Sequence, residues 1–233
     1  NLQRAMHEVQ EAARRLRSGE YGEVIGSSVH AFGGEISGGG CQRISVLRLF
    51  TDAEVEEVVA WGTPVEGLSG ETDEGLNFHG SFSMTNGLEC PFFGTDTSTR
   101  GVDVWTADTL VRWDWRAPKI FRGFGTGGER REIDPSYAGY EWSEFWYLTG
   151  SLRSFIGAVR GKGKPWITGH DLRQALEVAI ATKRSAELGS VPIKLPLEDR
   201  SLKLLPRPYR WLGGDLAGRP QPIEEVAGES EPQ

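Results

Sequence analysis

GGGCQRISVLRLF, residues 38–50, is the most informative segment of this 233-residue chain. Ile44, Leu47 and Arg48 follow the three glycines at helical spacing, so we expect a short helix that ends near Phe50. A helix amino end can hold an anion. However, the glycine spacing does not match the dinucleotide-binding fingerprint GxGxxG, and no alternating series of strands and helices surrounds it. We therefore interpret residues 33–40 as a glycine-rich loop in front of a helix.

Upstream of this loop, residues 4–18 carry apolar or small side chains at helical spacing. The dipeptide Ser18-Gly19 ends this predicted helix, because glycine readily adopts the conformation that follows a helix. After a turn, residues 24–32 are predicted to form a strand that leads into the loop.

Downstream, the hydrophobic period changes to two, which is typical of strands. The predicted strands are residues 55–63, 76–85, 87–93, 102–106 and 109–115. The turn Ala107-Asp108 is a hairpin signal between the last two strands, and 87–93 can return as the hairpin partner of 76–85. Because the connecting turns are short, the sheet should be mostly antiparallel. Residues 117–139 are predicted to be a loop or an irregular strand pair.

Two further helices are predicted at residues 141–160 and 170–188, where apolar positions again recur every three or four residues. Thr168 or Asp171 can cap the start of the second helix, and Gly189 ends it. The chain therefore combines segregated helices with a sheet of consecutive strands, which predicts an α+β (α/β) fold.

The remaining carboxyl-terminal sequence sets the domain boundary. Residues 191–197 are predicted to be a final short strand. Residues 213–233 are rich in Gly, Pro and Glu, so we expect a flexible tail after a single domain that spans residues 1–212.

The composition excludes several classes of function. The chain carries 33 acidic and 26 basic residues, a net charge of −7, which provides no electrostatic footprint for nucleic acid or an anionic membrane. No apolar run approaches the roughly 20 residues that span a bilayer. The two cysteines, Cys41 and Cys90, favour a reducing compartment, and we expect a cytoplasmic protein. No His, Cys, Asp or Glu set has the spacing of metal ligands, so no metal site is predicted.

Four segments form a further pattern: NLQR (1–4) with the helix into SGEYGEV (18–24), GCQRISVLRLF (40–50), GHDL (169–172) with Ala179, Ser185 and Ala186, and VPIKLP (191–196). In this order they resemble motifs of the glucose–fructose oxidoreductase / inositol dehydrogenase / rhizopine-catabolism family (Gfo/Idh/MocA). The resemblance covers roughly residues 1–200, and its specificity lies in the order of the four motifs.

The resemblance implies a large, mostly antiparallel open sheet with helices packed on one face, as in the C-terminal domain of this family. Members of the family also have an N-terminal Rossmann domain, and this chain would start just past it, with residues 1–18 as the linking helix. NAD or NADP would then be bound by that absent domain, and no cofactor-binding residue is expected in this chain. The open sheet face would make a homo-oligomer, a dimer or a tetramer.

The same resemblance points to the proton-handling position. The family has a histidine where this chain has Gln42 and an aspartate where it has Ser45. An amide cannot act as a general base at neutral pH, although it can form a hydrogen bond with a substrate hydroxyl. His30, at the end of the first strand, is a possible substitute base, and a histidine packed on the strand is an equally good interpretation.

Four other residues are candidates for contact with a sugar-like substrate. They are Arg43, Tyr137, Tyr140 and Trp142. The three aromatic residues lie at the entry to the predicted helix 141–160, a region that faces the sugar pocket in the resembling family. Core packing competes for Trp142, and Arg43 can instead pair with a surface carboxylate.

Three functional hypotheses follow. The first is the substrate-binding and oligomerisation domain of an NAD(P)-dependent oxidoreductase that acts on a sugar, a sugar derivative or a cyclitol and is inactive as this chain alone. The second is a non-catalytic carbohydrate-binding or assembly module, which Gln42 and the absence of the family's catalytic lysine favour. The third is an unrelated α+β carbohydrate-binding domain, against which the motif at 169–186 argues.

Overall fold

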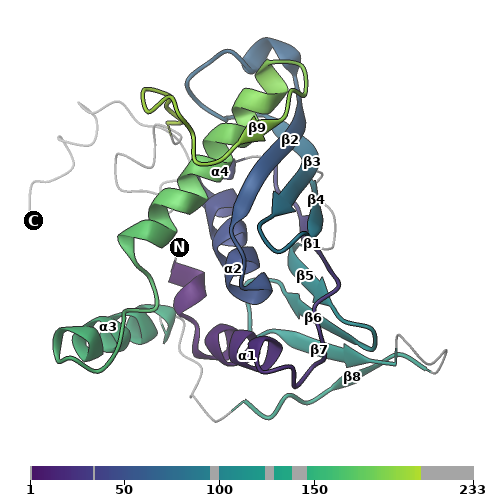
Figure 1. The fold of residues 1–233 in the computed structure, drawn as a ribbon, viewed down its shortest axis with the longest axis vertical. Coiled ribbons are helices and arrows are strands. Elements are labelled where there is room, and N and C mark those ends of the chain that lie inside the picture. The colour runs from purple at the N-terminus through teal and green to yellow at the C-terminus, as the bar shows by residue number, and fades with distance from the viewer. Residues whose placement is uncertain (1, 34, 95–99, 124–128, 138–145, 206–233) are drawn as a thin grey trace, which may run out of the picture.

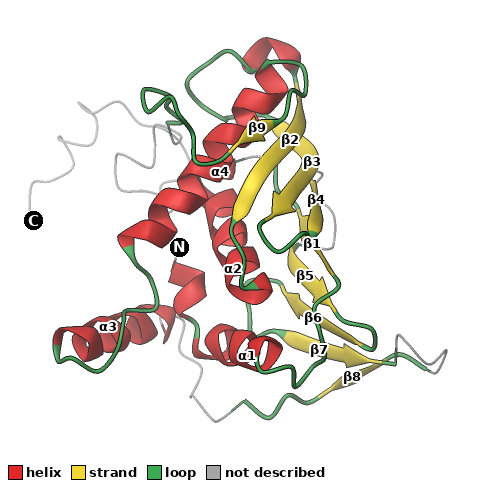
Figure 2. Ribbon diagram, in the orientation of Figure 1, coloured by secondary structure: helices red, strands yellow, loops and turns green. Residues whose placement is uncertain are grey.

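The computed structural model describes residues 2–33, 35–94, 100–123, 129–137 and 146–205. The described chain forms a single nine-stranded sheet with the helices on one side of it, as Figures 1 and 2 show. The predicted α+β fold with a mostly antiparallel open sheet is therefore confirmed.

The sheet has the strand order β8-β7-β6-β5-β1-β4-β3-β2-β9. Its strands are β1 (Gly26–His30), β2 (Val55–Thr63), β3 (Asn77–Met84), β4 (Glu89–Phe93), β5 (Gly101–Trp105), β6 (Thr109–Trp113), β7 (Lys119–Arg122), β8 (Arg131–Ile133) and β9 (Ile193–Lys194). β1 lies in the middle, with β2–β4 built on one side of it and β5–β8 on the other. The pair β1 and β4 is parallel, whereas the other pairs of neighbouring strands are antiparallel. The predicted hairpins β3–β4 and β5–β6 are both present.

The helical layer consists of η1 (Leu2–Ala5), α1 (His7–Arg17), η2 (Ile36–Gly40), α2 (Cys41–Thr51), α3 (Trp146–Val159) and α4 (Gly169–Glu187), with a short turn η3 (Val65–Gly67) between β2 and β3. α2 packs between α1 and α4 and also against the sheet, so nearly all of its side chains are buried. The glycine segment differs from the prediction, because Ile36–Gly40 is a π-helical turn that runs directly into α2 rather than a loop.

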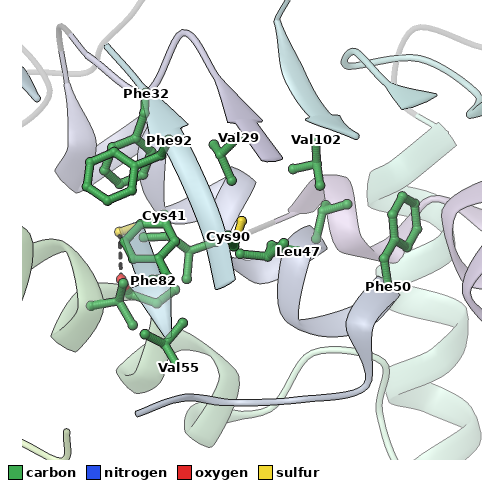
Figure 3. Close-up of a cluster of buried hydrophobic side chains, with 14 of the residues drawn as sticks. Val29, Phe32, Cys41, Leu47, Phe50, Val55, Phe82, Cys90, Phe92 and Val102 are labelled. Atoms are coloured by element: carbon green, nitrogen blue, oxygen red, sulfur yellow. Dashed lines mark hydrogen bonds between the residues drawn. The ribbon is translucent and has the colours of Figure 1, made fainter. Parts of the chain in front are cut away.

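The hydrophobic core lies between the sheet and this helical layer. Figure 3 shows Val29 of β1 and Val102 of β5 in one cluster with Leu47 and Phe50 of α2. Side chains alternate between the two faces along a strand. The residues next to Val29 and Val102 in their strands therefore lie on the sheet face opposite the helices.

α4 is held at its amino end by the predicted cap. The Thr168 side chain accepts a hydrogen bond from the Asp171 backbone, and the Asp171 carboxylate accepts one from the Thr168 backbone. This reciprocal capping box satisfies two backbone donors that helix geometry leaves free.

α3 is the least covered helix and projects from the rest of the domain in Figure 1. Its small residue Gly150 faces η1, where an added Cβ would overlap the carbonyl oxygen of Ala5. Its large apolar side chains are exposed: Leu148, Leu152, Phe155, Ile156 and Val159. Within the described ranges, no helix is long and apolar enough to cross a membrane.

Candidate functional site

The amino end of α2 carries two buried polar atoms that have no internal partner. Gln42 Oε1 and Ser45 Oγ are both shielded from solvent, and neither forms a hydrogen bond to another described residue. The two residues are three positions apart on the helix, so they share one face of it. η1 packs against α2 at this point, and Arg4 Nη1 donates to the backbone oxygen of Ser45 at 3.0 Å. An unpaired buried polar atom costs about 1–3 kcal/mol, so a further hydrogen-bond partner at either atom would stabilise the structure.

Arg43 points to a different neighbour. Its guanidinium carbon lies 5.0 Å from the ring centroid of Trp115, and the residue is only 7% exposed. Trp115 in turn packs against Trp113, with 5.1 Å between ring centroids. A Cβ on Gly39 would lie 3.1 Å from Arg43 Nη1, so glycine is the residue that leaves room for this stacked arginine. Arg43 and Trp115 thus form a rigid wall beside the amino end of α2.

The glycine segment is anchored by a residue that sequence reasoning missed. Asp73, which is fully buried, accepts hydrogen bonds from the Ser37 backbone at 2.7 Å and from the Ser37 hydroxyl at 3.2 Å. Asp73 belongs to the connection between β2 and β3 and is 36 positions away from Ser37 in the sequence. No local motif marks this contact, because neither residue lies in a pattern that requires the other.

Tyr137 follows β8 and contacts the far end of the β6–β7 loop, residues 114–118, which also carries Trp115. Its hydroxyl donates to the carbonyl oxygen of Pro118 at 3.0 Å, and the Arg15 guanidinium of α1 lies 5.6 Å from its ring centroid. Burial raises the pKa of Tyr137 above its ordinary value, so the phenol stays protonated. The structure therefore brings Arg43 and Tyr137 to one loop, whereas Tyr140 and Trp142 lie outside the described residues.

His30 is separated from Gln42 by the sheet. Its Nε2 atom lies 2.8 Å from Ser28 Oγ and 3.5 Å from Asp103 Oδ2, and its ring stacks on Phe93. Ser28 and Asp103 are paired across β1 and β5, next to the core pair Val29 and Val102, so they occupy the face without helices. Both polar partners meet the same ring nitrogen, which is not the two-ended arrangement of a Ser-His-Asp relay.

Asp103 is held as a carboxylate on that face. Burial alone would raise its pKa, but two hydrogen bonds from Arg112, at 2.8 and 2.5 Å, outweigh burial and lower the pKa. This pair ties β5 to β6 on the open face.

Neither cysteine is suited to nucleophilic chemistry. Cys41 and Cys90 are buried and form no disulfide, and burial raises the pKa of each thiol to about 12. A search of the described ranges finds no group of three or more His, Cys, Asp or Glu residues that could hold a metal ion. The arrangement at α2 is therefore suited to binding through hydrogen bonds and an aromatic wall.

Comparison with known proteins finds the fold but no close sequence relative. No protein-family model matches the sequence, and no curated protein matches it. Among solved structures, an aldose-aldose oxidoreductase from Caulobacter crescentus has a TM-score of 0.62 at 18% identity and is matched over 84% of this chain and 62% of its own. An inositol dehydrogenase homolog from Azotobacter vinelandii, complexed with NADH and myo-inositol, has a TM-score of 0.59 at 12% identity, over 83% of this chain and 63% of its own.

A third match is an oxidoreductase from Agrobacterium radiobacter in complex with NAD+, L-tartaric acid and magnesium. It has a TM-score of 0.57 at 15% identity, over 82% of this chain and 62% of its own. The chain thus spans less than two thirds of the length of the structures that it matches. The chain therefore shares its fold with part of these oxidoreductases, which agrees with the fold that the resemblance implies.

Proposed function

We propose that this chain is the substrate-binding half of an NAD(P)-dependent oxidoreductase that removes hydride from a CH–OH group of a sugar, a sugar derivative or a cyclitol. The observation that carries the proposal is the pair of partnerless buried atoms, Gln42 Oε1 and Ser45 Oγ. They occupy the two positions at which the resembling family has its histidine and aspartate. The shared fold with an aldose-aldose oxidoreductase and an inositol dehydrogenase homolog supports a polyol substrate.

In this proposal the residues at α2 bind and orient the substrate. The carboxamide of Gln42 can accept a hydrogen bond from one substrate hydroxyl and donate one to another. It cannot take up the hydroxyl proton at neutral pH, so Gln42 is a positioning group and the base is a different residue. The Arg43–Trp115 wall excludes water on one side, and aromatic rings also suit the apolar face of a sugar.

The cofactor and the partners belong to the same proposal. NAD or NADP supplies the hydride acceptor when bound, and we place it on a dinucleotide-binding domain outside these 233 residues. The exposed apolar face of α3 supports the packing of such a domain. Gly150 of α3 faces η1, whereas the large apolar side chains of α3 face solvent and would be covered by a further domain. Exposed Trp61 and Phe93, at 53% and 42%, support a homo-oligomer through the open sheet face.

A second candidate is a carbohydrate-binding or assembly module without redox chemistry. The identity of Gln42 and Ser45 favours it, because neither side chain titrates near neutral pH. Both candidates require polyol binding at α2, and turnover separates them.

The first experiment measures polyol binding by isothermal titration calorimetry, with glucose, gluconate and myo-inositol as ligands. The protein is the 233-residue chain, alone and together with a dinucleotide-binding domain from the same reading frame or operon. Gln42→Ala should weaken binding about tenfold, because the loss of a hydrogen bond to a buried site costs about 1–1.5 kcal/mol. Gln174→Ala on α4 removes the same side chain elsewhere and should have no effect.

The second measurement follows NAD(P)H formation by absorbance. Turnover supports the oxidoreductase, whereas binding without turnover supports the binding module. Equal affinities of wild type and Gln42→Ala, or no polyol binding in either form, would contradict both candidates. The 233-residue chain alone should show no saturable NAD(H) binding, and micromolar affinity there would refute the assignment of the cofactor to another domain.

A further inference from the structure

A pocket of about 500 Å³ lies at the carboxyl end of α2, where α1, α2, residues 164–168 and the start of α4 meet. Leu49 lines this pocket, and it is seven residues beyond Gln42 on the same helix, or roughly 10 Å at 1.5 Å per residue. The pocket is therefore separate from the candidate site at the amino end of α2.

The inner wall of the pocket consists of ion pairs, in which each positive charge is balanced by a carboxylate. Arg48 donates from Nε and Nη2 to the two carboxylate oxygens of Glu54, both at 2.6 Å. Arg4 Nη2 lies 3.3 Å from Asp171 Oδ1. The side chain of Arg48 is 3% exposed and that of Asp171 is 10% exposed, so these pairs are fixed parts of the wall.

Two further cations line the pocket without a carboxylate partner. Arg17 donates only to the carbonyl oxygen of Leu49, at 3.4 Å, and Lys164 has no polar contact to another described residue. The lining contains four basic and three acidic residues, and Asp52, the third carboxylate, is exposed at the rim. The pocket is thus cationic in a chain whose net charge is −7.

The cations repel one another. Burial lowers the pKa of Arg4, and the charges of Arg48 and Arg17 lower it further, against the opposing effect of Asp171. An anion placed between Arg17 and Lys164 would reduce this repulsion and provide both side chains with a partner. Half-buried Pro165 and Trp166 add an apolar wall on the same side as Lys164.

We propose that this pocket binds a small organic oxyanion, a carboxylate or a phosphate ester, with its charged group between Arg17 and Lys164 and its carbon skeleton against Trp166. Neither Gln42 nor Ser45 lines this pocket, so the proposal does not require the proposed oxidoreductase function, although Arg4 of the pocket wall also binds the backbone of Ser45.

Benzoate, phenyl phosphate and inorganic phosphate are suitable probes, since none of them resembles a polyol. Titration of the 233-residue chain, followed by calorimetry and by tryptophan fluorescence, should show saturable binding of benzoate or phenyl phosphate, and the stronger of the two identifies the preferred anion. That organic anion should bind several-fold more tightly than inorganic phosphate, because only it can pack against Trp166. Equal or tighter binding of inorganic phosphate would overturn the role of the aromatic wall.

Arg17→Gln and Lys164→Gln should each weaken binding about tenfold, the lower end of the effect of one lost charge-assisted hydrogen bond, because both side chains are exposed. Both side chains are exposed, so the variants should fold, which circular dichroism verifies. Lys162→Gln is the matched control, because Lys162 is an exposed lysine of the same connection that does not line the pocket. Gln42→Ala should also leave binding unchanged, which separates this site from the polyol site.

Two results would overturn the proposal. One is the absence of saturable binding of both organic anions up to about 10 mM. The other is an equal loss of affinity in Lys162→Gln and Lys164→Gln, which would indicate attraction by overall charge rather than a built site.

Discussion

Asp171 connects the amino end of α4 to two buried arginines, and its replacement by alanine tests the helical layer most directly. The carboxylate accepts hydrogen bonds from the Thr168 backbone at 2.9 Å and the Thr168 hydroxyl at 2.7 Å. Arg4 and Arg48 place guanidinium nitrogens 3.3 and 3.6 Å from Asp171 Oδ1. A single substitution therefore removes the carboxylate half of the capping box and the counter-charge of two arginines.

The expected loss is worked out from these contacts. A lost cap costs about 1 kcal/mol. Breaking a buried ion pair costs about 3–5 kcal/mol. In Asp171→Ala, however, Arg48 still pairs with Glu54 and Arg4 still donates to two carbonyl oxygens, so we assign about 2 kcal/mol to the loss of the ion pairs. Asp171→Ala should therefore lower the free energy of unfolding by about 3 kcal/mol, or the melting temperature by roughly 6–12 °C.

Urea denaturation followed by tryptophan fluorescence measures this difference. Thr168→Ala removes the cap alone and should lower the free energy of unfolding by about 1 kcal/mol. Asp199→Ala removes an exposed carboxylate and should change it by less than about 0.5 kcal/mol. If Asp171→Ala is no more destabilising than Thr168→Ala, the pairing with the two arginines contributes nothing and the reasoning is refuted.

The same carboxylate predicts a pH dependence. Burial alone would raise the pKa of Asp171, but the hydrogen bond from Thr168 and the charge of Arg4 outweigh burial and lower it. Since the folded-state pKa is below the unfolded value of about 3.9, the stabilisation is complete above that value and is lost as the pH falls through the folded-state pKa. Asp171→Ala should therefore lose less stability than wild type between about pH 4 and pH 2.

Two further substitutions test the sheet and the exposed helix. Gly101→Ala should lower the free energy of unfolding by about 3 kcal/mol or more, because φ is +97° and the added Cβ would overlap the carbonyl oxygen of Trp113. Gly161→Ala, at φ +73° in open space, should lower it by only about 1 kcal/mol. Equal losses for the two variants in urea denaturation would contradict the β5–β6 register. The double change Leu152→Ser and Phe155→Ser on α3 should leave the melting temperature within about 2 °C of wild type, because these side chains are 61% and 58% exposed, and a large loss of stability would show that this face is buried.

Local patterns were sufficient for most of the secondary structure. The period-two segments became β2 to β6, and the predicted cap at Thr168 is a complete capping box. The glycine segment was predicted as a loop and is a π-helical turn, because Asp73 from a distant connection binds Ser37 and fixes it. The last strand is shorter than predicted, with only Ile193–Lys194 paired, since it adds to the edge of the sheet beside β2 alone.

The candidate site was predicted only in part. The resemblance pointed to Gln42 and Arg43, but the partner of Arg43 is Trp115, which lies in a turn that the sequence assigned to the end of a strand. Trp115 contacts Arg43 because the β6–β7 loop packs against α2. No spacing in the sequence encodes that approach, since the two residues are far apart along the chain.

By itself the sequence determined most of the helices and strands, because these depend on the hydrophobic period and on the chemistry of single residues. Only the tertiary structure decided that His30 lies on the face of the sheet away from α2, the helix that carries Gln42. That separation follows from the placement of β1 between β4 and β5, with Val29 directed toward α2. Neighbouring residues of a strand point in opposite directions. Because Val29 points into the core, His30 points away from the helices.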